Sequence, residues 1–143
     1  MDPEKFLILG EELVKRATPC DCRTAIGRAY YGVLQVTAAY IGGAGFSLPK
    51  QTEIHQKLWW DLLNCGLPEL APAGSELSAL HGMRIKADYR MKDTDSEDHE
   101  TAKYWVRLAR DHFETIKDAF GVLKRQQTID AIRAYRKKAN RPL

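Results

Sequence analysis

The chain has 143 residues, of which 44% are hydrophobic and 29% are charged, and its formal net charge is +3. These values are typical of one soluble globular domain, and no apolar run approaches the roughly 20 residues that a membrane-spanning helix needs. Three cysteines without a disulfide framework indicate a reducing compartment, so we expect a cytoplasmic protein with no membrane partner. The four histidines are scattered along the chain, and we therefore expect neither a metal site nor a cofactor.

The first two helices are predicted from the start of the chain to Ile41. One runs from Pro3 to about Ala17, where Thr18-Pro19 ends it. The next, from Arg23 to Ile41, is apolar over most of its circumference, a pattern typical of the central helix of a domain. Asp21 is placed to cap it. Its apolar residues recur at spacings of three and four: Ile26, Tyr30, Leu34, Thr37, Ala38 and Ile41.

The remaining chain also reads as helical. Two helices are predicted from about Thr52 to Asn64 and from about Gly74 or Ser75 to Tyr89. A long helix is expected from about Glu97 to Arg125, and a short basic helix from about Thr128 to Lys138. No segment alternates apolar and polar residues as an exposed strand would. The sequence thus predicts an all-α fold, a four-helix bundle of the up-down type with an additional short C-terminal basic helix.

The charge is distributed unevenly along the chain. Residues 124–143 hold seven basic residues and one acidic residue, a net charge of +6, whereas residues 1–123 have a net charge of −3. We therefore divide the chain into a helical bundle, residues 1–125, and a basic helix or tail, residues 126–143. Such a tail is expected to be solvated and mobile, or to contact a polyanion.

Two motifs occur in a characteristic order. Arg28-Ala-Tyr-Tyr31 lies in the second predicted helix, and Arg84-Ile-Lys-Ala-Asp-Tyr89 precedes an acidic turn and a long last helix; between them lies a predicted helix with His55. In this combination the chain resembles the HEPN superfamily (higher eukaryotes and prokaryotes nucleotide-binding), and more narrowly its stand-alone prokaryotic branch with an R-x-x-A-D-Y signature. The resemblance covers roughly residues 3–122.

The resemblance implies a four-helix bundle that often forms a homodimer, with its polar motif in a cleft at the dimer interface. Many members of the superfamily are metal-independent ribonucleases. Others are inactive binding modules, often encoded beside a nucleotidyltransferase-like partner in toxin–antitoxin or defence systems. Active members have a histidine separated from their arginine by four to six intervening residues. Here Arg84 matches the arginine, but the positions in question hold Tyr89, Arg90 and Met91.

From the resemblance and the helical spacing, we expect Arg28, Tyr31, Arg84, Asp88 and Tyr89 to line one polar cleft. Arg84 and Asp88 are four residues apart, so they meet on one helix face. Asp88 either fixes the helix through an ion pair or orients Arg84 toward an anionic ligand. An unperturbed tyrosine, with a pKa of about 10, is a poor base near pH 7.

Three other histidines are candidate replacements for the one missing from the motif. His55 and His81 are candidate neighbours of Arg84, although a lone histidine near apolar residues is more often structural. Arg107 and His112 also satisfy the arginine-histidine spacing. Five helical steps should point their side chains in different directions, so this pair is not expected to form a site.

Three functional interpretations are compatible with the sequence. The first is a HEPN-like module that binds RNA, nucleotide or a partner protein without turnover, and the missing histidine favours it. The second is a metal-independent, toxin-like endoribonuclease in which Arg84 acts with Tyr89 or Asp88. The third is a helical scaffold subunit.

Overall fold

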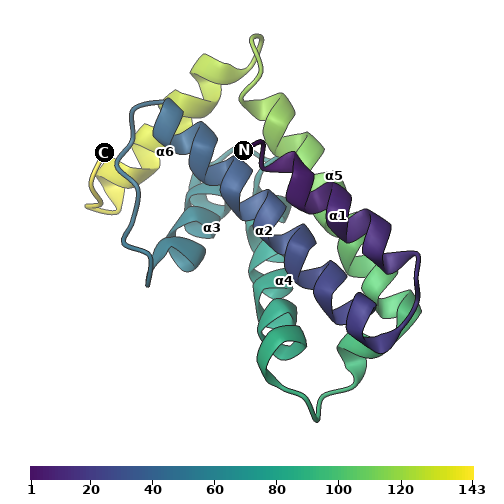
Figure 1. Ribbon diagram of the computed structural model, residues 1–143. Helices are drawn as coiled ribbons and strands as arrows, with labels where there is room; N and C mark the ends of the chain where they lie inside the picture. The colour runs from purple at the N-terminus through teal and green to yellow at the C-terminus, as the bar shows by residue number, and fades with distance from the viewer.

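A computed structural model describes all 143 residues, and it is entirely helical (Figure 1). The α-helices are α1 (Glu4–Val14), α2 (Pro19–Gly43), α3 (Ile54–Asn64), α4 (Ala71–Tyr89), α5 (His99–Ala119) and α6 (Arg125–Lys138). A short 3₁₀ turn, η1 (Asp95–Glu97), precedes α5. The predicted all-α fold class is therefore confirmed, and α1, α3 and α4 differ from the predicted helices by only a few residues at their ends. None of the six helices combines the length and the apolarity that a membrane crossing requires.

Helix α2 is the centre of the fold. It packs against α1, α4 and α5, and Ile26, Leu34 and Ile41 are almost or entirely buried, as predicted. The helix begins earlier than predicted, because Thr18 and not Asp21 is its cap: the Thr18 hydroxyl accepts the Asp21 backbone N–H at 3.2 Å. Pro19 is compatible with this start, since the first turn of a helix needs no N–H donor there.

The C-terminal region differs most from the prediction. Helix α5 ends at Ala119 instead of near Arg125, because the chain turns at Gly121, and α6 then begins. Figure 1 shows α6 beside α3, and four side chains of α6, those of Thr128, Ile129, Ile132 and Arg136, are buried. The expectation of a solvated tail is therefore wrong, since one face of this basic helix belongs to the core.

A buried ion pair joins α6 to α3. Arg136 is 1% exposed, and its Nη2 and Nε donate to the two carboxylate oxygens of Asp61 at 2.7 and 3.1 Å; Asp61 itself is fully buried. The Nη1 atom of Arg136 donates to the carbonyl oxygens of Ser47 and Pro142. All three nitrogens of this guanidinium are thus bonded, which explains how a charged side chain is accommodated among apolar residues.

Candidate functional site

The two arginines of α2 have different surroundings. Arg23 is buried, and its Nη1 donates to the carbonyl oxygens of Lys86 and Ala87, at the C-terminal end of α4, at 3.1 and 3.0 Å. Its Nε donates to Glu97 at 3.1 Å. Because these carbonyls are the negative end of the α4 dipole, Arg23 stabilises the end of that helix. Arg28 instead makes neither an ion pair nor a side-chain hydrogen bond, and its Nε is buried without a partner.

The structure brings together the five residues expected in a polar cleft: Arg28 and Tyr31 of α2 with Arg84, Asp88 and Tyr89 of α4. We call this set the α2–α4 polar cluster. Nη2 of Arg84 donates to the Tyr31 hydroxyl, and its Cζ lies 4.8 Å from the Tyr31 ring centre and 5.4 Å from that of Tyr89. The Cζ of Arg28 lies 5.7 Å from the Tyr31 ring centre. Two guanidinium groups therefore contact the same aromatic ring.

The cluster has a surplus of positive charge. Its one carboxylate, Asp88, lies 2.9 Å from Nε of Arg84, an ion-pair distance. The Nε–H bond does not point at that oxygen, however, so this buried nitrogen makes no hydrogen bond. A Cβ at Gly27 would lie 3.3 Å from an oxygen of Asp88, which shows how closely this carboxylate approaches the backbone of α2. Arg28 has no carboxylate of its own, and one positive charge of the cluster thus stays uncompensated.

Three stacked rings adjoin the cluster. The Tyr30 hydroxyl lies 2.6 Å from Nδ1 of His55, and the parallel rings of His55 and His81 are 4.4 Å apart between centres. Tyr30 is fully buried and contacts the edge of the Tyr31 ring. The sequence alone indicates both histidines only as candidate neighbours of Arg84, because they lie on different helices and no spacing relates them.

The surroundings keep this stack uncharged near pH 7. Burial lowers the pKa of His81 to about 4, with smaller contributions from the nearby His55 and Arg84. Burial and the charge of Arg84 also lower the pKa of His55. Burial raises the pKa of Tyr30 above its usual value, so its hydroxyl stays protonated. The charged group that acts on all three rings is the guanidinium of Arg84, a member of the polar cluster.

The pair Arg107 and His112 of α5 forms a separate surface feature. Both residues line one shallow hollow of about 210 Å³, so their side chains meet a common space despite the predicted divergence. The His112 imidazole lies 2.8 Å from a carboxylate oxygen of Glu76. Arg84 does not line this hollow, and the pair is not a substitute for the histidine missing from the motif.

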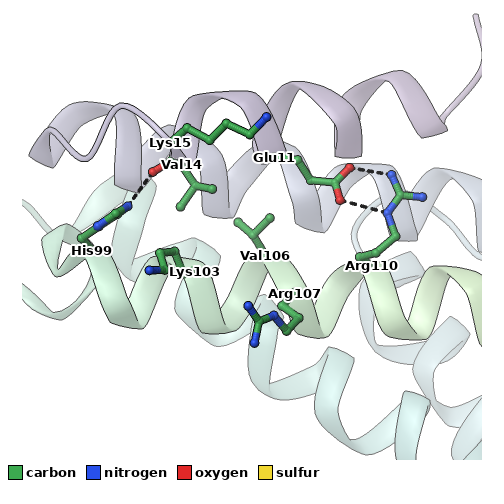
Figure 2. Close-up of a pocket in the computed structure, with 8 residues that line it drawn as sticks. All are labelled: Glu11, Val14, Lys15, His99, Lys103, Val106, Arg107 and Arg110. Atoms are coloured by element: carbon green, nitrogen blue, oxygen red, sulfur yellow. Dashed lines mark hydrogen bonds and ion pairs between the residues drawn. The ribbon is translucent and has the colours of Figure 1, made fainter.

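A larger hollow, of about 560 Å³, lies between α1 and α5 (Figure 2). Arg110 on its edge donates to both carboxylate oxygens of Glu11, and His99 donates to the Val14 carbonyl oxygen at 2.8 Å. Arg110 also pairs with Glu4 and Glu114, which raises its pKa further. Arg110, Lys15 and Lys103 of this hollow are each paired with carboxylates, which leaves Arg107 as its one unpaired cationic side chain.

No group of three or more histidine, cysteine, aspartate or glutamate side chains is placed to hold a metal ion. No family model, curated protein or solved structure matches the chain. Function therefore has to be inferred from the polar cluster and the rings beside it.

Proposed function

We propose that this protein is a HEPN-like helical module that binds the phosphate groups of RNA or a nucleotide without turning them over. The main support is the placement of Arg28 and Arg84 around one tyrosine ring against the single carboxylate of Asp88. A planar guanidinium suits a phosphate, because it donates two parallel hydrogen bonds and also stacks on aromatic faces. Nε of Arg28 still lacks an acceptor, and an oxyanion is a suitable one.

The proposal includes a homodimer in which the second copy covers α4. Tyr89 and Met91, at the end of this helix and just beyond it, are 69% and 63% exposed. Large apolar groups exposed beside a charged cluster are common at interfaces between proteins. A nucleotidyltransferase-like protein is the proposed further partner, and a cytoplasmic toxin–antitoxin or defence system is the proposed context.

A metal-independent endoribonuclease is the second candidate, and the stacked imidazoles beside the charge of Arg84 favour it. A neutral histidine can accept a proton from a 2′-hydroxyl, while Arg84 stabilises the phosphate charge, with Tyr89 or Asp88 as the alternative base. Cleavage also needs a group that protonates the leaving oxygen. The lowered pKa values leave both imidazoles without that proton near pH 7, so binding ranks above catalysis.

The test compares Arg84→Lys with the wild type in RNA and nucleotide binding, with melting temperature measured on the same samples. Lysine keeps the charge but loses the two-pronged geometry, so affinity should fall about tenfold, or about 1.4 kcal/mol. Arg107→Lys, at an exposed position of α5 outside the cluster, is the matched control and should leave affinity unchanged. If Arg84→Lys lowers the melting temperature but not the affinity per folded molecule, the cluster is structural.

The same proteins also decide between binding and catalysis. Wild type and Arg84→Ala are incubated with structured and with single-stranded RNA in the absence of divalent metal. We expect binding without cleavage. Cleavage by the wild type that disappears in Arg84→Ala would replace the binding proposal with the endoribonuclease.

A further inference from the structure

A second surplus of positive charge lies at the far end of α6, where one buried carboxylate is shared by two arginines. In addition to its two bonds with Arg136, Asp61 accepts a hydrogen bond from Nη1 of Arg141 at 2.7 Å. The Arg141 side chain is only 11% exposed, and this is its one hydrogen bond. A guanidinium has five N–H donors. Two positive charges, of Arg136 and Arg141, and one negative charge, of Asp61, thus lie together where little water reaches them. A further anion would stabilise this group of charges.

A hollow of about 200 Å³ opens directly on this group. Lys50 and Lys57 line it together with Arg141, and Glu53 is the one carboxylate in its wall. Glu53 lies 2.8 Å from Nζ of Lys57, which lowers the pKa of Glu53 and keeps it ionised, so the charges of these two residues compensate each other. Lys50 has no ion-pair partner. The side chains that face the hollow are thus predominantly cationic.

The hollow lies beside the start of α3, since Glu53, which precedes this helix, and Lys57 line it. Glu53 is the first residue before α3, and no side chain caps this helix, so the N–H groups of its first turn lack an intrahelical acceptor. The N-terminal end of a helix also has a partial positive charge, which favours phosphate groups. The hollow therefore combines cationic side chains, a buried surplus charge and a helix N-terminus.

We propose that this hollow is a second anion site, which binds a phosphate group between Lys50, Lys57 and Arg141. The inference does not depend on Arg84, because the two groups of residues share no member. The phosphate is either free, as in inorganic phosphate and nucleotides, or part of an RNA backbone. Arg136 is a positioning residue here, since its nitrogens are bonded to Asp61 and to backbone carbonyls.

The test is titration of the isotope-labelled protein with inorganic phosphate and tripolyphosphate, followed by amide chemical shifts. The amide chemical shifts of residues 47–57 and 141 should change together as phosphate is added. Lys50→Gln removes an exposed, unpaired cation without touching the buried pair, and it should weaken binding several-fold. Arg141→Gln should weaken it tenfold or more. Glu53→Gln frees Lys57 and should strengthen binding. Arg133→Gln, which removes a half-exposed cation of α6 outside the hollow, should have no effect.

RNA binding at several salt concentrations separates the two phosphate sources. If the site holds a backbone phosphate, Lys50→Gln should reduce the slope of log affinity against log salt by about 0.7, the value for one contact to a single strand. An unchanged slope with phosphate binding retained identifies free phosphate or a nucleotide as the ligand. The proposal fails if phosphate moves no shifts at the hollow, or if Arg133→Gln weakens binding as much as Lys50→Gln.

Discussion

Replacing Arg136 with alanine should destabilise the protein by about 3–5 kcal/mol, the usual effect of removing one partner of a buried ion pair. The substitution leaves Asp61 buried with only Arg141 as a partner, at 2.7 Å, and this remaining contact should keep the loss toward the lower end. It also removes the donors to Ser47 and Pro142. Since small domains have about 5–15 kcal/mol of stability in total, the loss should lower the melting temperature by roughly 10 °C.

Urea unfolding followed by far-ultraviolet circular dichroism measures this effect. Arg133→Ala on the same helix is the matched control. Its ion pair with Asp130 spans 3.7 Å between side chains that are 43% and 62% exposed, and such a surface pair contributes about 0–1 kcal/mol. The reasoning is refuted if Arg136→Ala unfolds within about 1 kcal/mol of Arg133→Ala, because α6 would then not belong to the cooperative core.

Three further predictions concern the polar cluster and its surroundings. Arg28→Met should leave the unfolding free energy unchanged or raise it by up to about 1 kcal/mol, because the substitution removes a buried Nε that has no hydrogen bond. RNA affinity should fall about tenfold in the same variant. A large loss of stability would contradict the view that Arg28 serves binding and not folding. Stability should fall as the pH decreases from about 6.5 to 4, because over this range the unfolded state protonates His81 and the folded state, with a pKa of about 4, does not. The full change in unfolding free energy is at most about 3 kcal/mol, and the partial exposure of the His81 ring reduces it. The substitution His81→Asn should flatten the dependence of stability on pH. If the stability of this variant falls with pH as steeply as that of the wild type, the imidazole of His81 is not held neutral by the fold. Light scattering at micromolar concentration should give about twice the chain mass of 16.3 kDa, and a monomer mass would exclude the proposed dimer.

The sequence was sufficient to predict the helices whose packing follows their own periodicity. The stripe through Ile26, Leu34 and Ile41 is buried as expected. The same reasoning failed at the end of α5, where the apolar period continues through Phe120 and Leu123. Leu123 is 99% exposed, because the chain turns at Gly121 and the apolar face of α6 packs on α3 instead. Periodicity alone does not distinguish these outcomes, since long-range contacts decide between them.

At the candidate site, too, the sequence predicted only those residues that a local pattern relates to one another. Arg84 and Asp88 were related by helical spacing, and a motif added Arg28, Tyr31 and Tyr89. Contacts between distant segments had no such signal. Arg136 and Asp61 are 75 positions apart, and in a count of charges Arg136 was only one of seven basic residues near the C-terminus. The bonds from Arg23 to the end of α4 were missed for the same reason.

The two groups of arginines in this protein differ in a way that bears on function. Arg136 is bonded through all three nitrogens, as expected of a side chain selected for stability. Arg28 retains a buried Nε without an acceptor, and a donor of this kind costs roughly 1–3 kcal/mol, whereas Nε of Arg84 lies 2.9 Å from Asp88. Residues that lower stability in this way are typical of binding sites, where a ligand supplies the missing acceptor. The neutral imidazoles beside Arg84 add no proton donor near pH 7. The cluster therefore has a surplus of cationic donors, which is what the proposed recognition of an anion requires.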